Sequence, residues 1–92
     1  MKNNTKEENA RCAEEFFDWV RNEWDEKGDN IFLWDLWELE TDGGIYLKDD
    51  YAAAPDNSHP NAAFNKRVAP LAAKRIVDVI EGRGDSTSID AR

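Results

Sequence analysis

Hydrophobic residues recur at helical spacing in the first part of the chain. Successive apolar positions lie three, one, three and four residues apart, so they share one face of a helix: Ala13, Phe16, Phe17, Val20 and Trp24. Upstream, Thr5-Lys6-Glu7-Glu8 has the form of a capping box, and Gly28 is a suitable terminator. The pattern predicts a helix over 5–27 whose aromatic stripe belongs to the core.

The next segment has the pattern of a buried strand. Residues 30–38 hold a dense run of aliphatic and aromatic side chains, bounded by Gly28-Asp29 and by Thr41-Asp42-Gly43-Gly44. Consecutive apolar residues are typical of a strand buried on both faces, as in a parallel sheet. We expect Trp34 and Trp37 to pack at this strand, with a substrate or sugar platform as the alternative role. A second run of comparable strength is missing, so the sheet is expected to be incomplete.

A loop and a second helix follow. Residues 48–59 are rich in Asp, Ala and Pro and read as a loop, and a helix is expected over 60–81, beginning near Pro60 or Asn61. Pro70 predicts a kink or a break in that helix. Its apolar stripe comprises Phe64, Val68, Leu71, Ala72, Ile76, Val79 and Ile80. Gly82 and Gly84 end it, and residues 85–92 are expected to be a flexible tail, which leaves 1–84 as one partial domain.

Composition and charge narrow the classes of partner. The 92 residues carry a net charge of −8, with 6 basic and 16 acidic residues in 1–59 against 6 and 4 in 60–92. Such a chain lacks the basic stripe that binds phosphate backbones, so we expect no nucleic-acid partner. It also lacks a long apolar stretch and an apolar N-terminal segment, so we expect neither a membrane partner nor a signal peptide. Cys12 stands alone and is expected to be a small packing residue.

Candidate chemistry is concentrated before the second helix. Asp56 and His59 are spaced so that a turn brings the carboxylate to one imidazole nitrogen, which leaves the other nitrogen available as a base. The structural alternative is a helix-capping or surface histidine. A second alternative is a metal site built from Asp49, Asp50, Asp56 and His59, since carboxylates and an imidazole suit hard or borderline cations.

The block Asp56-Asn57-Ser58-His59-Pro60-Asn61 resembles the last sequence block of the SGNH, or GDSL-type, ester hydrolases. In that family an Asp-x-x-His pair, commonly followed by Pro, precedes the C-terminal helix. The likeness covers about residues 30–81. It implies that His59 is the general base, that Asp56 orients it, and that no metal or organic cofactor takes part. The implied fold is α/β: the C-terminal α-β-α piece of a flavodoxin-like three-layer α/β/α sandwich, with residues 31–37 as its last core strand.

The sequence also departs from that family. Its nucleophile block, Gly-Asp-Ser, belongs near the N-terminus after the first strand, whereas here it occurs once, as Gly84-Asp85-Ser86, behind the last helix. The Gly and Asn of the oxyanion hole do not precede Asp56. We therefore expect the C-terminal portion of an SGNH-type esterase, inactive alone, whose parent hydrolyses an ester such as an acylated carbohydrate or lipid. The alternative is a small acidic interaction module that self-associates or adds to a partner sheet.

Overall fold

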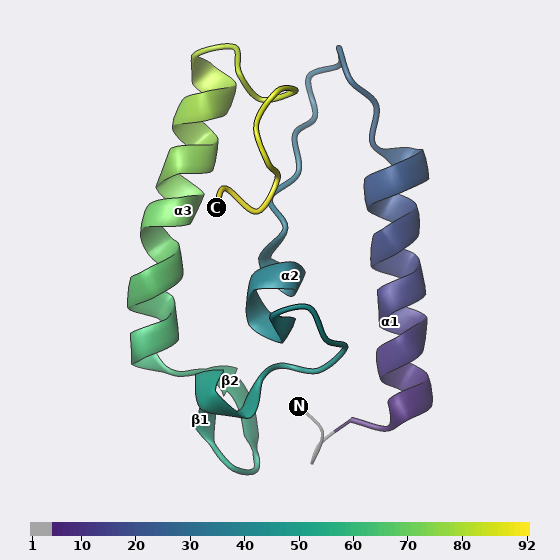
Figure 1. The fold of residues 1–92 in the computed structure, drawn as a ribbon, viewed down its shortest axis with the longest axis vertical. Coiled ribbons are helices and arrows are strands. Elements are labelled where there is room, and N and C mark those ends of the chain that lie inside the picture. The colour runs from purple at the N-terminus through teal and green to yellow at the C-terminus, as the bar shows by residue number, and fades with distance from the viewer. Residues whose placement is uncertain (1–4) are drawn as a thin grey trace.

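The computed structural model describes residues 5–92 as a mixture of helix and sheet (Figure 1). Its α-helices are α1 (Glu7–Trp19), α2 (Leu36–Thr41) and α3 (Ala62–Ile80). A π-helical turn, η1 (Val20–Trp24), continues α1, and a 3-10 turn, η2 (Asp49–Tyr51), precedes a hairpin. The hairpin pairs β1 (Ala52–Ala54) antiparallel with β2 (Asn57–Pro60), with Ala52 opposite Pro60.

The elements lie in one thin layer. Figure 1 shows α1 and α3 at opposite edges, with the segment before α2 and the C-terminal residues running between them. The Cα atoms span 40 × 29 × 16 Å. The shortest of these spans, 16 Å, is less than half of the longest, so the molecule is flat and not spherical. The small core is therefore made between neighbours within the layer, around Leu39, Phe64 and Val68.

The first predicted helix is present but shorter than expected. It ends with η1 at Trp24, before Gly28, and the capping box is wrong: Lys6 is the N-cap and no side chain caps the helix. The predicted core stripe is only partly correct, because one side of α1 alone faces the rest of the chain. Phe17 packs on Trp37 with ring centroids 5.4 Å apart, whereas Phe16 and Trp24 are exposed. Cys12 is exposed as well, which contradicts its expected packing role.

The strand predicted over 30–38 is not formed. Residues 31–35 run between α1 and α3, and no strand of the described residues pairs with them. A strand is defined by its pairing. From Leu36 the chain is helical, because the Asp35 carboxylate accepts a hydrogen bond from the Glu38 amide (3.0 Å) and so caps α2. The helix buries Leu39 and ends at Asp42 in the left-handed conformation (φ 51°). The mixed helix and sheet content is thus confirmed, while the central element differs.

The second predicted helix is confirmed as α3, which runs unbroken through Pro70. Pro70 is exposed, so the carbonyl that it leaves without an amide donor can bond to water, and no break follows. The loop predicted over 48–59 is instead η2 and the hairpin. At the other end, Gly82 adopts φ 81°, in agreement with its expected role as a terminator.

The C-terminal residues are folded back, which contradicts the prediction of a flexible tail over 85–92. The Asp35 amide donates to the Ile89 carbonyl (2.8 Å), the Gly28 amide donates to the Asp85 carboxylate (2.9 Å), and Ala91 is buried. A Cβ atom on Gly84 would lie 2.6 Å from the Phe32 ring, so a larger residue here would displace that ring. The unpaired backbone of residues 31–35 thus obtains part of its hydrogen bonding from the tail.

Arg75 connects α3 to the central segment, residues 31–35, and to the start of the C-terminal tail. It is 4% exposed, and its Nε donates to the Leu33 carbonyl (2.6 Å) while Nη1 donates to the Gly84 carbonyl (2.8 Å). Nη1 also lies 3.4 Å from the Thr87 hydroxyl. One side chain of α3 therefore holds both the central segment and the start of the tail.

Replacing this guanidinium is expected to destabilise the fold. Arg75→Met keeps an apolar stem but leaves two carbonyl groups without their donor, so the free energy of unfolding should fall by about 2–4 kcal/mol. Urea unfolding followed by tryptophan fluorescence measures the change. Lys66→Met, at an exposed position of the same helix, is the matched control and should stay within about 0.5 kcal/mol of the parent. Equal unfolding midpoints for the two variants would contradict the role given to Arg75.

Candidate functional site

The Asp56–His59 block lies on the hairpin that precedes α3. Asp56 is in the turn between the strands and His59 is in β2, both exposed to solvent. The hairpin projects from one end of the layer (Figure 1). The structure therefore brings the two predicted site residues into one short, accessible element.

The orientation of the imidazole is set by a residue that the sequence analysis did not single out. Nδ1 of His59 lies 2.7 Å from Oδ1 of Asn57, and the same oxygen accepts the backbone amide of His59 (3.0 Å). An amide oxygen only accepts hydrogen bonds, so Nδ1 carries a proton in this contact, and in the neutral ring the lone pair is therefore on Nε2. This is the tautomer that a general base requires. The signal in the sequence was the Asn two residues before His59, a spacing typical of an Asx turn.

Asn61 fixes the hairpin to the helix behind it. Its Oδ1 accepts the Phe64 amide (2.8 Å) and so caps α3, while its Nδ2 donates to the Asp50 carbonyl (2.8 Å) and the Ala52 carbonyl (3.2 Å). Its backbone amide donates to the Tyr51 carbonyl (2.7 Å). One asparagine therefore satisfies the helix N-terminus and the base of the hairpin together.

Aromatic packing connects the base of the hairpin to the core. The Tyr51 and Phe64 rings have centroids 5.0 Å apart, and the Arg67 guanidinium lies 4.5 Å from the Tyr51 centroid. Phe64 is itself a member of the core cluster. The exposed histidine is thus carried on an element whose base is anchored in the interior.

A charged pair lies beside the same tyrosine. Lys48 Nζ is 3.3 Å from the Asp42 carboxylate, to which the Tyr51 hydroxyl also donates at 3.4 Å. The hydrogen bond from Lys48, and then its charge, lower the pKa of Asp42, and the same bond raises the pKa of Lys48. Both groups are therefore charged at neutral pH.

The other candidates take different places. Trp34 packs against the core cluster, and its indole N–H is buried without a hydrogen-bond partner in the described residues. Trp37 lies against Phe17 and under the Arg21 guanidinium (5.5 Å). Both tryptophans therefore have packing contacts, as expected. Among residues 5–92 the structure holds no group of three or more His, Cys, Asp or Glu side chains placed to bind a metal.

The Gly84-Asp85-Ser86 block is far from the histidine. It follows the C-terminal end of α3, and the hairpin precedes the N-terminal end (Figure 1). The 19 residues of α3 span about 28 Å at 1.5 Å per residue, so Ser86 cannot reach His59 in the same chain. The Ser86 hydroxyl instead donates to the Arg83 carbonyl (3.2 Å). Ser58 is adjacent in sequence, but successive side chains of a strand point to opposite faces.

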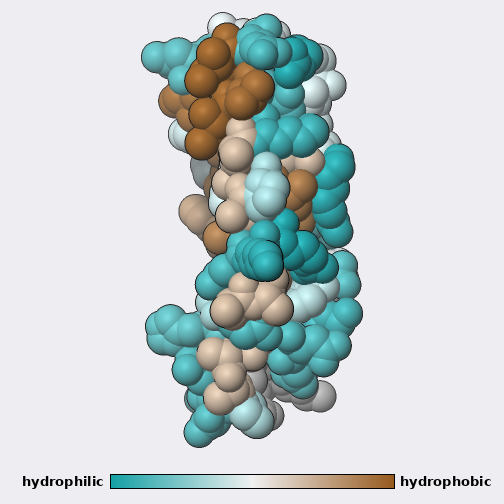
Figure 2. Space-filling view, turned by 90° about the vertical axis from the view of Figure 1, so that its left-hand side faces the viewer, coloured by the Kyte–Doolittle hydropathy of each residue, from teal (hydrophilic) through white to brown (hydrophobic). Residues whose placement is uncertain are grey.

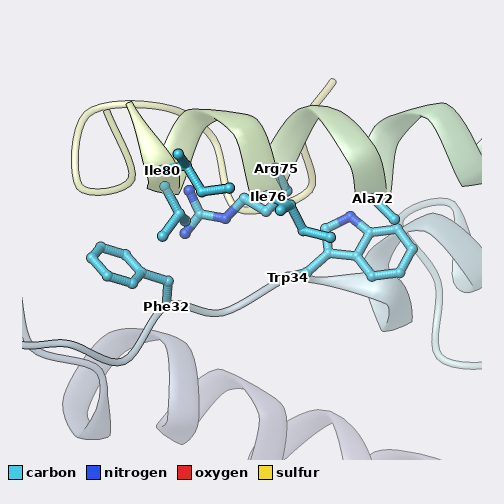
Figure 3. Close-up of a pocket in the computed structure, with 7 residues that line it drawn as sticks. Phe32, Trp34, Ala72, Arg75, Ile76 and Ile80 are labelled. Atoms are coloured by element: carbon cyan, nitrogen blue, oxygen red, sulfur yellow. The ribbon is translucent and has the colours of Figure 1, made fainter. Parts of the chain in front are cut away.

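A hollow lies at the other end of α3, remote from the hairpin. It has a volume of about 290 Å³ and is lined mainly by apolar side chains, as Figure 3 shows for Phe32, Trp34, Ile76 and Ile80. Arg75 lines the hollow as well. Neither Asp56 nor His59 lines this hollow.

No family model matches the chain, and no curated protein or solved structure matches it. In the described residues, no helix has the length and apolar character needed to cross a bilayer.

The position of the histidine should depend on Asn61. Asn61→Ala removes the cap of α3 and two donors to the hairpin base, so the free energy of unfolding should fall by about 1–2 kcal/mol. The His59 side-chain NMR signals should also shift, because its strand loses its anchor. Asn65→Ala, one turn into the same helix and exposed, is the control and should change neither quantity. A stability equal to that of the control would show that Asn61 is not the anchor.

Proposed function

We propose that this chain contributes the histidine and aspartate of an SGNH-type ester-hydrolase site, with the serine nucleophile and the oxyanion donors supplied by polypeptide outside these 92 residues. The observation that carries the proposal is the presentation of His59. Its imidazole is exposed on a hairpin directly ahead of a capped helix, with Nδ1 on an acceptor and Nε2 left as the basic atom. The sequence block around it resembles the block in which this family places its general base.

The proposed chemistry is acyl transfer to water. The external serine attacks the ester carbonyl, His59 Nε2 accepts the serine proton, and the resulting imidazolium then protonates the leaving alcohol. Asp56 stabilises the imidazolium, and Asn57 holds the ring in the required tautomer. In the second half of the reaction His59 takes a proton from water, the water attacks the acyl-serine ester, and the serine oxygen leaves and regains a proton from His59, which releases the acid. The substrate class is an ester, such as an acyl group on a carbohydrate or lipid, and the reaction needs no metal or organic cofactor.

The arrangement of the helices is compatible with such a site. Residues 31–35 run between α1 and α3, and the amides of Phe32, Leu33 and Trp34 have no hydrogen-bond partner in the described chain. A partner strand would complete this backbone, as β-addition does in other proteins. This supports a role for the chain as one part of a larger α/β unit.

A second candidate function is a small acidic interaction module. The observation that favours it is the set of large apolar side chains left exposed on α1 and α3, among them Trp19 and Ile80. In this role the chain would bind a partner sheet or itself, and His59 would be an ordinary surface residue. The two functions predict different effects of replacing His59: a loss of ester hydrolysis in the first, and no effect on partner binding in the second.

A fusion tests the esterase role. The 92-residue chain is joined behind the N-terminal part of an SGNH-type esterase, in place of that enzyme's own last helix, strand and Asp-x-x-His block, and turnover of an activated acetate ester is measured. We expect hydrolysis by the fusion, and a loss of about 10³-fold or more in kcat for His59→Ala because the serine loses its base. Ser58→Ala, on the opposite face of β2, is the matched control and should keep full activity.

The unfused chain should give no turnover above its own His59→Ala variant, because it lacks oxyanion donors beside the histidine. A fusion that folds, as judged by a cooperative melt, yet is inactive or indifferent to His59→Ala would refute the proposed function.

A further inference from the structure

The hollow at the C-terminal end of α3 combines an apolar lining with one charged residue, Arg75. Figure 3 shows Phe32 at one end of this hollow and Trp34 with Ala72 at the other. Ile80, which also lines it, is 77% exposed, and Figure 2 shows a strongly hydrophobic patch near the upper end of the side that carries α3. An apolar molecule in the hollow would remove part of this surface from water.

The guanidinium group of Arg75 lies at the Phe32 end of the hollow. Its Nη1 donates to the Gly84 carbonyl (2.8 Å). A Cβ atom on Gly84 would lie 2.6 Å from the Phe32 ring and 3.2 Å from the Val79 side chain, so Gly84 is packed against two residues that line the hollow. The charge is therefore at one end of the apolar lining and not at its middle.

The described chain leaves part of this guanidinium without a partner. Its hydrogen bonds come from Nε and Nη1, whereas Nη2, which carries two N–H groups, has no partner among residues 5–92. Nη2 is not sealed from solvent either, so an atom of a bound molecule can approach it. A largely buried cation is stabilised by an anion that accepts such a free hydrogen bond. The hollow thus favours a molecule with a negative group at one end.

The acidic side chains near this end of α3 do not supply that anion. Asp78 pairs with Lys74 (3.1 Å) and with Arg83 (2.8 Å), and Glu81 also pairs with Arg83. No carboxylate of the described residues lies within ion-pair distance of Arg75. The charge of Arg75 therefore remains available to a bound anion.

We propose that the hollow binds a free, linear carboxylic acid of about eight carbons, with the carboxylate at Nη2 of Arg75 and the chain directed toward Ala72. From Ala72 to Val79 the helix rises about 10 Å, and an extended carbon chain covers this length in about eight bonds. The volume of about 290 Å³ indicates the same size, because it holds about ten non-hydrogen atoms at about 30 Å³ each. Octanoate, with eight carbons and two oxygens, fits both estimates.

Charge separates this acid from other molecules of the same shape. A neutral alcohol would pair with Nη2 without neutralising the guanidinium, and an ammonium group would lie beside a second cation. The inference does not rest on the ester-hydrolase role, because the hairpin with His59 is at the other end of α3.

Binding is tested by NMR on the full, ¹⁵N-labelled chain titrated with octanoate. We expect a saturable shift of the Trp34 indole N–H signal, and much smaller shifts for Trp19, Trp24 and Trp37, which do not line the hollow. Octan-1-ol and octylammonium have the same chain and should bind at least tenfold more weakly, because the first lacks the negative charge and the second has the opposite one.

The direction of the chain is tested by two substitutions. The parent should bind octanoate about tenfold more tightly than hexanoate, because two more methylene groups are buried. Ala72→Leu fills the end of the hollow remote from the charge and should remove this preference. Ala73→Leu makes the same change at the next position, which is exposed and outside the lining, and should keep the preference. Circular dichroism verifies that both variants keep their helix content.

An unchanged Trp34 signal, equal binding of octan-1-ol, or equal effects of the two leucine substitutions would overturn the proposal. None of these measurements involves hydrolysis, so their outcome is separate from the test of His59.

Discussion

The fold depends on one buried guanidinium. Arg75 reaches from α3 to the carbonyl of Leu33 in the central segment and to the carbonyl of Gly84 at the start of the tail, and it is 96% shielded from water. No carboxylate of the described residues lies within ion-pair distance of it, so its charge is balanced by carbonyl dipoles instead. Removing the donor would leave these carbonyls unsatisfied, and this makes a single residue important to a chain with so small a core.

The thin shape follows from the same arrangement. The tail pairs with residues 31–35 at one point, where the Asp35 amide donates to the Ile89 carbonyl. The amides of residues 32–34 have no hydrogen-bond partner among residues 5–92. Elements joined side by side cannot cover their own broad faces, so aromatic residues of α1 and aliphatic residues of α3 remain at the surface. The proposed ester-hydrolase role uses the hairpin, which projects from one end of the layer.

The sequence predicted the elements whose signals are local. The helix over 62–80 was found because its apolar period and its start near Pro60 or Asn61 agree, and the hairpin residues Asp56 and His59 were placed together because only a short turn separates them. The strand over 30–38 was not found, because apolar density cannot supply the partner strand that defines one. The cap of α2 at Asp35 has the capping pattern Asp-x-x-Glu in the sequence. It was missed because the surrounding aromatic residues favoured a strand. The tail was missed because its order comes from Arg75, far away in sequence.

Arg75 holds the central segment and the tail together. Amide hydrogen exchange read by NMR measures this directly, because the Asp35 amide is protected only while Ile89 lies against it. In Arg75→Met we expect the Asp35 amide to lose far more protection than the Phe64 amide, which is held by the Asn61 cap. Equal losses at the two amides, or an unchanged Asp35, would show that the central segment and the tail are held together without Arg75.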